Sequence, residues 1–298
     1  MVAIFEIYRP SSLDDAVEFL HKHAPDARPL AGGTELLILI RDKKIKPPKY
    51  LVDLSPLRKD LSYVKLENGL VKIGALTTVW ELSESFLHRD PRYAGFKDVW
   101  HKFGTMHLRF VATIGGNIAT ATDFSDYIVL LLAYGASVKL RSVDGERVVP
   151  LEELIADRRQ LAARPDELIV EVLFPEPPPR SSSSFEKFDR RQILIAGIAN
   201  GCSYLHLDEG GKIADVRISF DMVKGKRIPG RVKPVEDFLR GKVFTEELVT
   251  RAAEEVLPRV MEKYTDWWTT AEYRLEMSKV TLKRTLLIAK KRIEGGAL

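Results

Sequence analysis

The chain has 298 residues, 45% of them hydrophobic and 30% charged, which is the balance of a globular protein and not of a disordered or fibrous one. Its 46 basic and 42 acidic side chains leave a net charge of +4, so a nucleic-acid partner is not expected. The apolar stretches fall far short of the about 20 residues that cross a bilayer. The first residues lack a secretory signal pattern, so we expect a cytoplasmic protein with no membrane span.

Residues 1–58 predict a small unit of strands and helices, whose ends are indicated by capping and turn-forming residues. Asp14 and Asp15 favour the first turn of a helix, because acidic side chains stabilise a helix N-terminus. In chain order we predict a strand at 5–8, a helix capped by Ser11 or Ser12, a short apolar entry at 28–31, a helix at 35–41 and a strand at 50–54.

Residues 59–176 predict a second unit that contains two hairpins. Asn68-Gly69 and Asp144-Gly145 are typical of tight hairpin turns. The predicted elements are hairpin strands at 63–67 and 70–73, a helix from Thr77-Thr78 to about His88, helices at about 93–103 and 126–134, hairpin strands at 136–141 and 146–149, a short helix from Pro150 and a strand at 167–174.

Three consecutive prolines at 177–179, followed by four serines at 181–184, predict a boundary that neither a helix nor a strand continues through. Beyond it the predicted elements are strands at 185–188, 195–207 and 212–220 and amphipathic helices near 245–262 and 270–293. The layout is therefore α+β, with a first domain at 1–176 (lobes about 1–58 and 59–176) and a smaller sheet-plus-helices domain at 182–298.

Cysteine and histidine usage excludes several kinds of metal site. Cys202 is the single cysteine, so this chain can form neither an internal disulfide nor a four-cysteine zinc or iron–sulfur site. Because Cys202 falls in an apolar run, we expect a buried, inert thiol. The six histidines show no metal-ligand spacing.

Two glycine-rich loops, at 31–35 and 113–117, are the main candidates in the sequence for a binding site. Dinucleotide binding needs backbone N–H groups that approach a pyrophosphate closely, which glycines at a turn allow. Glycine pairs also make simple turns, so both interpretations remain open at this point. The chain has no G-x-G-x-x-G, P-loop or G-x-S-x-G motif, so Rossmann, P-loop and serine-hydrolase sites are not supported.

Residues 29–36 and 112–119 resemble the two FAD loops of the medium subunit of molybdenum hydroxylases, a family that includes carbon monoxide, xanthine and aldehyde dehydrogenase flavoproteins. Residues 73–78 resemble the family's segment between the loops, and residues 271–274 its C-terminal signature. The resemblance implies a two-lobed FAD-binding domain of the vanillyl-alcohol-oxidase/PCMH type followed by a small C-terminal domain.

The resemblance also implies which residues contact the FAD. The pyrophosphate would lie on Pro29, Leu30, Ala31, Gly32, Gly33, Thr34, Glu35 and Leu36 of the first loop and on Thr113, Ile114, Gly115, Gly116 and Asn117 of the second. Asp126 matches a hydrogen-bond acceptor for the cofactor, Phe103 an aromatic residue on the adenine, Ile169 an apolar contact, Lys187 a lysine at the flavin and Ile195 a residue near the isoalloxazine ring.

The residues themselves leave plainer alternatives open for these positions. Lys187 at the start of a strand is typical of a solvent-facing residue, although a fixed ammonium beside the flavin would raise its reduction potential. Asp126 is also a candidate N-cap of the helix that follows it. Phe103 and Ile169 fit an ordinary hydrophobic core, and Arg109 is a weaker candidate for a phosphate contact.

Two departures from the family pattern affect what the resemblance implies. Residues 265–270 replace an Asp-x-Arg-Gly-Ser-like stretch of the family, so the resemblance implies nothing about subunit contacts or the flavin edge at these residues. Residues 119–126 lack the cysteine-bearing insertion of the 4-hydroxybenzoyl-CoA reductase branch, so no iron–sulfur cluster is expected in this chain.

By resemblance, the chain is an oxidoreductase subunit that passes electrons through FAD from [2Fe–2S] clusters to an external acceptor. The molybdenum cofactor would lie on a large molybdopterin-binding subunit and the clusters on a small iron–sulfur subunit, in a heterotrimer or a dimer of heterotrimers. No residue of this chain need act as an acid, base or nucleophile. The alternatives are a self-sufficient FAD-dependent oxidase or reductase of the same fold and a non-catalytic nucleotide-binding protein.

Overall fold

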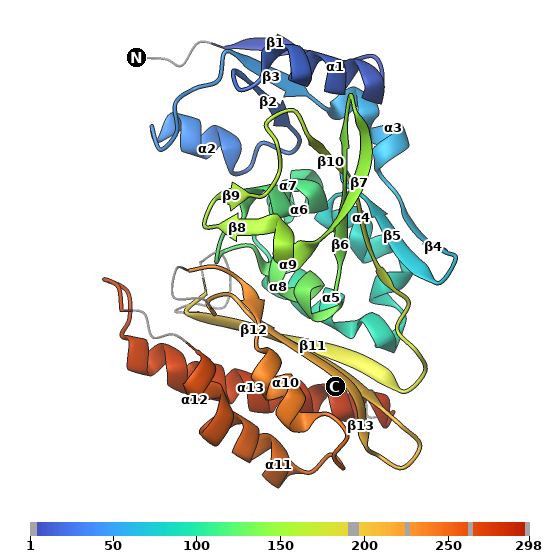
Figure 1. Cartoon of the computed structure of the whole chain (residues 1–298), viewed down its shortest axis with the longest axis vertical. Coiled ribbons are helices and arrows are strands. Elements are labelled where there is room, and N and C mark those ends of the chain that lie inside the picture. The colour runs from blue at the N-terminus through green and yellow to red at the C-terminus, as the bar shows by residue number, and fades with distance from the viewer. Residues whose placement is uncertain (1–4, 190–196, 224–226, 262–264, 296–298) are drawn as a thin grey trace.

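The computed structural model describes residues 5–189, 197–223, 227–261 and 265–295. Three sheets follow one another along the long axis of the molecule, each with helices packed beside it (Figure 1). None of the helices in the described ranges combines the length and apolar character that crossing a membrane requires.

The first sheet is parallel and has the order β1-β3-β2. Its strands are β1 (Glu6–Tyr8), β2 (Ala27–Leu30) and β3 (Tyr50–Asp53), and its helices are α1 (Leu13–His23), α2 (Leu36–Arg41) and α3 (Arg58–Leu61). The hydroxyl of Ser12 accepts a hydrogen bond from the backbone N–H of Asp15, so Ser12 is the N-cap of α1. This arrangement confirms the predicted order of strands and helices in the first 58 residues.

The second sheet is antiparallel and has the order β4-β5-β10-β6-β7. Its strands are β4 (Val64–Glu67), β5 (Leu70–Gly74), β6 (Ser137–Ser142), β7 (Gly145–Pro150) and β10 (Leu168–Pro175). Both predicted hairpins are confirmed, because β4 pairs with β5 and β6 pairs with β7. A separate two-stranded ribbon is formed by β8 (Ile155–Asp157) and β9 (Gln160–Leu161).

Helices occupy the space between the second and third sheets. They are α4 (Val79–Glu84), α5 (Ala94–Lys102), α6 (Met106–Val111), α7 (Ile114–Thr120), α8 (Asp126–Ala133) and α9 (Leu151–Leu154). Thr78 caps α4 through a capping box with Glu81, as predicted. The prediction of one helix to His88 was wrong, because Ser85 is extended and its hydroxyl accepts from Leu87 N to start a separate 3-10 turn.

The third sheet is antiparallel, with the order β11-β12-β13-β14. Its strands are β11 (Ser181–Phe188), β12 (Ala199–Leu207), β13 (Ile213–Phe220) and β14 (Gly230–Arg231). The helices that follow are α10 (Lys233–Leu239), α11 (Glu246–Arg251), α12 (Leu257–Val260) and α13 (Ala271–Ile293), with a π-helical segment at Ala252–Val256 between α11 and α12. The predicted helix at 245–262 is therefore not a continuous α-helix.

The four serines that were predicted to end regular structure instead form the first half of β11 and are buried. Their burial is possible because their hydroxyls find partners. Ser183 Oγ accepts from Gly95 N at 2.9 Å and lies 2.6 Å from Tyr134 Oη, and Ser182 Oγ donates to Pro91 O at 2.7 Å. These partners come from segments 49 to 91 residues earlier, so local composition gave no sign of them.

The third sheet contributes to two hydrophobic cores. Phe185, Cys202 and Tyr204 belong to the core of the second sheet and its helices, whereas Leu205 and Ile218 belong to the core formed with α10–α13. The β11–β12 pair is thus covered on both faces, by α5 and α8 on one and by α13 on the other. As predicted, the Cys202 thiol is buried, and burial raises its pKa.

Candidate cofactor site

The first glycine loop connects the end of β2 to the start of α2. Gly33 has a φ of +69°, a left-handed conformation that glycine adopts without steric cost. Glu35 occupies the N-cap position of α2, but its side chain makes no capping hydrogen bond. Residues 29–36 are all partly exposed: none is buried and none is fully exposed. The Glu35 carboxylate instead pairs with Arg159 at 2.7 Å.

The second glycine loop is helical, which the sequence did not predict. Thr113 is the N-cap of α7, and its hydroxyl accepts from Gly116 N at 3.1 Å. Gly115 and Gly116 thus lie in the first turn of a helix. The first N–H groups of α7 already have acceptors within the chain, because those of Ile114 and Gly115 donate to the carbonyl oxygens of Thr77 and Ala75. Any attraction of this helix end for an anion therefore comes from the helix dipole and not from free N–H groups.

The two glycine loops lie directly against each other. A Cβ atom added to Gly32 would lie only 2.0 Å from the carbonyl oxygen of Val111, just before α7. A Cβ added to Gly116 would lie 4.0 Å from the Cβ of Ala31. The fold therefore brings together two segments about 80 residues apart in sequence, as one FAD-binding groove would require.

Gly115 serves a different purpose from Gly116. A Cβ on Gly115 would lie 2.8 Å from both the Cβ and the carbonyl oxygen of Ala75, and the Gly115 N–H donates to that oxygen at 2.9 Å. Gly115 is buried, whereas Gly116 is partly exposed. A side chain at Gly115 would thus collide with Ala75, and not with a phosphate as we expected from the sequence.

Asn117, one residue further along α7, carries a polar atom that lacks a partner. Its Oδ1 is buried and makes no hydrogen bond to the described part of the chain. Such atoms are rare in folded proteins, because burying one without a partner costs free energy. An amide oxygen without a partner can accept a hydrogen bond from a ligand. FAD, the cofactor that the resemblance implies, has suitable donors in its ribityl and ribose hydroxyls.

Asp126 and Lys187 form a buried ion pair between α8 and β11. The Lys187 Nζ lies 2.9 Å from Asp126 Oδ2 and 3.2 Å from Oδ1, and Asn200 Nδ2 donates to the same Oδ1 at 3.2 Å. Burial raises the pKa of Asp126, and the charge of Lys187 opposes that shift. Lys187 is therefore not the solvent-facing residue that a strand start suggests.

Asp126 is the first residue of α8 and not its N-cap, a position that Ser125 occupies. Asn200 and Asp221 belong to the same buried region but were not identified from the sequence. Asn200 N donates to Asp221 Oδ2 at 3.0 Å, and burial raises the pKa of that carboxyl well above its usual range. No sequence motif surrounds either residue; only the pairing of strands from different parts of the chain reveals them.

Phe103 lies at the C-terminal end of α5, partly buried, with its ring 5.6 Å from that of Tyr127. Arg109 holds the adjacent turn, because its Nε donates to Phe103 O at 2.8 Å and its guanidinium lies over the Trp100 ring at 4.1 Å. Arg109 is thus used in packing, and burial lowers the pKa of its guanidinium. The structure does not support the weaker suggestion that it pairs with a phosphate.

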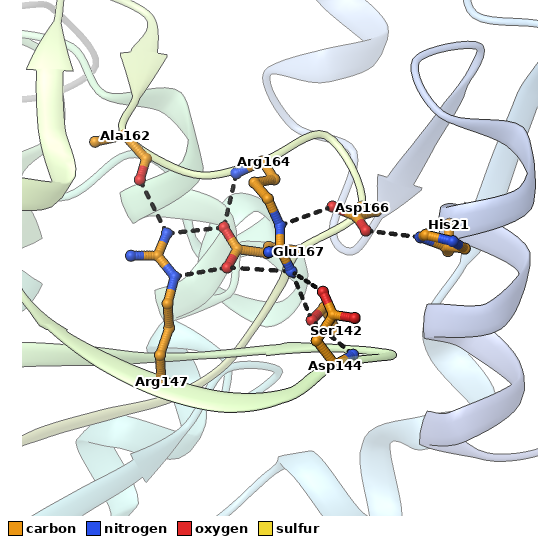
Figure 2. A network of polar contacts seen from close by, with 8 residues as sticks. All are labelled: His21, Ser142, Asp144, Arg147, Ala162, Arg164, Asp166 and Glu167. Carbon is orange, nitrogen blue, oxygen red and sulfur yellow. Dashed lines mark hydrogen bonds and ion pairs between the residues drawn. The ribbon is translucent and has the colours of Figure 1, made fainter.

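Ile169 is the second residue of β10 and lies partly buried against the central core. The turn just before it is held by the polar network of Figure 2. Glu167 accepts from Arg147 Nε at 2.6 Å and from the Arg164 backbone N–H at 2.7 Å, and the hydrogen bonds from Arg147 lower its pKa. Asp166 reaches across to α1, where its Oδ2 lies 2.9 Å from His21 Nδ1. The network fixes where β10 begins and hence where Ile169 points.

The remaining predicted contact, Ile195, lies outside the described residues. Among the described residues, no group of three or more histidine, cysteine, aspartate or glutamate side chains is arranged to hold a metal ion.

Comparison with known proteins assigns the chain to a family. The family described as "FAD binding domain in molybdopterin dehydrogenase" matches residues 3–177, and that described as "CO dehydrogenase flavoprotein C-terminal domain" matches residues 183–289. The chain therefore belongs to the FAD-binding flavoprotein family of molybdopterin dehydrogenases.

Individual relatives agree with this assignment. The carbon monoxide dehydrogenase medium chain of Afipia carboxidovorans is 30% identical over 98% of this chain and 98% of its own. The nicotinate dehydrogenase FAD-subunit of Eubacterium barkeri is 28% identical over the same shares. The structure of a carbon monoxide dehydrogenase from Hydrogenophaga pseudoflava matches with a TM-score of 0.90 at 26% identity, covering 98% of this chain and 99% of that chain.

These findings confirm the predicted family, the α+β fold with its FAD-binding and C-terminal domains, and FAD as the cofactor. The chain is a subunit of an oxidoreductase.

Proposed function

We propose that this chain carries electrons through its FAD, from [2Fe–2S] clusters on a partner subunit to an external acceptor. The observation that supports this most is the close approach of the two glycine loops at Ala31 and Gly116, with the unpartnered Oδ1 of Asn117 in the next residue. Bound there, FAD supplies the capacity to accept and release electrons, while the protein positions it and tunes its potential.

Within this proposal, the chain's own residues have separate tasks. The pyrophosphate lies on residues 29–36 and 113–117, where the dipole of α7 favours its negative charge, and the Asn117 amide oxygen accepts a hydrogen bond from a cofactor hydroxyl. Lys187 supplies a positive charge that Asp126 fixes in position. Phe103, Ile169 and Ile195 provide apolar contacts. Because Asp126 largely balances its charge, the Lys187 ammonium acts on the flavin as one end of a fixed dipole and not as a free cation.

The domain division proposed for this function follows the sequence prediction, with an FAD-binding domain at 1–176 made of lobes at about 1–58 and 59–176, and a C-terminal domain at 182–298. The Lys187–Asp126 pair joins the two domains beside the proposed flavin position. A subunit whose cofactor lies at a domain boundary keeps its flavin in place only when both domains are folded together.

The proposed partners are a large molybdopterin-binding subunit and a small iron–sulfur subunit. The single cysteine of this chain cannot hold a cluster, and it is buried. Relatives are named as medium chains and FAD-subunits of dehydrogenases, which implies further chains in those enzymes. We propose a heterotrimer or a dimer of heterotrimers for this protein as well.

The decisive experiment compares the isolated flavoprotein with the complex that co-purifies with it. The expected complex contains molybdenum, iron and FAD, and its organic substrate bleaches the FAD anaerobically within the turnover time. The isolated chain with FAD bound should show no such bleaching with that substrate. Turnover at full rate by the isolated chain would instead support the self-sufficient oxidase or reductase of the same fold.

A further inference from the structure

The β8–β9 hairpin ends in a turn whose arginine reaches the first glycine loop. Arg159 has a φ of +62°, and its NH1 lies 2.7 Å from Glu35 Oε1. In Figure 1 this hairpin lies below α2, on the same side of the molecule. The contact links the second unit of the chain back to the N-cap of α2.

The turn of this hairpin is held by contacts to the chain around α7. The Arg159 backbone N–H donates to the carbonyl oxygen of Ala121, the C-cap residue of α7, at 2.7 Å. The neighbouring Arg158 pairs with Asp123 at 3.0 Å, and the side chain of that aspartate is fully buried. The Arg159 side chain therefore extends from a fixed backbone toward Glu35.

These contacts tie the first glycine loop to α7 at two places. Ala31 lies beside Gly116 near the N-terminus of α7, and Glu35 is joined through Arg159 to Ala121 at its C-terminus. Asn117, with its unpartnered Oδ1, falls between these two tie points. The Glu35–Arg159 pair thus ties the last part of the loop to the C-cap of α7, next to the place proposed for the cofactor.

We propose that Arg159 is a positioning residue that clamps the first glycine loop against α7 and so slows the release of FAD. This inference rests on the proposed FAD site. The side chains of Arg159 and Glu35 are 32% and 35% exposed, and an ion pair that exposed contributes little to the free energy of unfolding. The pair instead affects how long FAD stays bound. FAD leaves when the first glycine loop moves away from α7, and the ion pair opposes that movement.

The test measures the rate at which FAD leaves the holoprotein, followed by the rise in flavin fluorescence after dilution. R159A should release FAD about threefold to fivefold faster than wild type, the range that an exposed ion pair supports. E35Q should show the same increase, and the double variant should be no faster than either single variant, because all three remove one interaction. R159K should recover part of the slow release.

The matched control is R141A. Arg141 pairs with Asp14 of α1 at 2.9 Å, so it too links the first and second units, but away from the glycine loops. Its variant should release FAD at the wild-type rate. Thermal unfolding of the apoprotein should be nearly the same for all single variants.

Two results would overturn the clamp. One is an unchanged rate in R159A while the wild type retains FAD. The other is fast release in R159A but not in E35Q, because Arg159 would then act on the cofactor itself and not through Glu35. A wild-type chain that binds no FAD would overturn the proposed function, which keeps the two failures distinct.

Discussion

The ammonium of Lys187 lies 2.9 Å from a carboxylate oxygen of Asp126, and the two side chains are only 6% and 3% exposed. The pair joins β11 to α8, which belong to different units of the chain. A second donor, the Asn200 side-chain amide, also contacts Asp126. The charge of each partner is therefore tolerable in this buried place only while the other is present.

K187M should destabilise the protein by about 3–5 kcal/mol, because it leaves the Asp126 carboxylate buried without its counter-ion. Urea unfolding of the apoprotein measures this loss. The double variant D126N/K187M should recover much of it, since no unpaired charge remains. A loss below about 1 kcal/mol in K187M would contradict the mutual dependence of the pair.

N117A should separate cofactor binding from folding. The variant removes a buried oxygen that has no partner, so the apoprotein should be as stable as wild type or slightly more so. The affinity for FAD should fall about tenfold, the effect of losing roughly one hydrogen bond. Titration with FAD and thermal unfolding of the same samples check both halves. A destabilised apoprotein with unchanged FAD affinity would show that Asn117 acts only in the fold.

The two glycines of α7 should respond differently to substitution. G115V should destabilise the apoprotein by about 1–3 kcal/mol, because the side chain overlaps Ala75. In G116A the new methyl group would lie 2.8 Å from the Thr113 hydroxyl and 4.0 Å from the Cβ of Ala31, so the N-cap side chain must move. Alanine favours the helix, so most of α7 should be kept while FAD binding weakens. Circular dichroism and FAD content together distinguish the outcomes. Normal FAD content in G116A would be evidence against the groove.

The stability of the protein should depend on the ionisation of His88. Burial lowers the pKa of this imidazole from 6.5 to about 4. The unfolded chain therefore binds a proton between those values that the folded chain does not, so this contribution is full above pH 6.5 and is lost as the pH falls toward 4.

Comparing wild type with H88Q isolates that contribution from the other titrating groups. Urea unfolding at pH 7 and at pH 4.5 measures how far the free energy of unfolding falls between the two pH values. The fall should be about 1–2 kcal/mol larger for wild type than for H88Q, allowing for the partial exposure of the ring. Parallel losses in the two proteins would mean that His88 does not carry this pH dependence.

Local patterns predicted the elements whose chemistry is contained in a few adjacent residues. The Asn68-Gly69 hairpin and the helix start at Thr77-Thr78 are examples, since turn and cap preferences act over two to four residues. Ser183 shows the opposite case: its burial in β11 depends on Gly95 and Tyr134, far away in the chain.

The same distinction applies to the candidate site. The two glycine loops were visible in the sequence, but the packing of Gly115 on Ala75 was not, because a glycine gives no sign of what lies beside its missing side chain. Arg159 was also missed. A charged residue in a hairpin turn is usually solvated, and only the fold places it against Glu35.

The FAD groove is tested most directly by titrating the flavin-free chain with FAD and counting the flavin that it retains after ultrafiltration. We predict one FAD for each wild-type chain and a much smaller amount for G116A at the same FAD concentration. A wild-type chain that retains no FAD, although it is folded by circular dichroism, would contradict the proposed site and the electron-transfer function that depends on it.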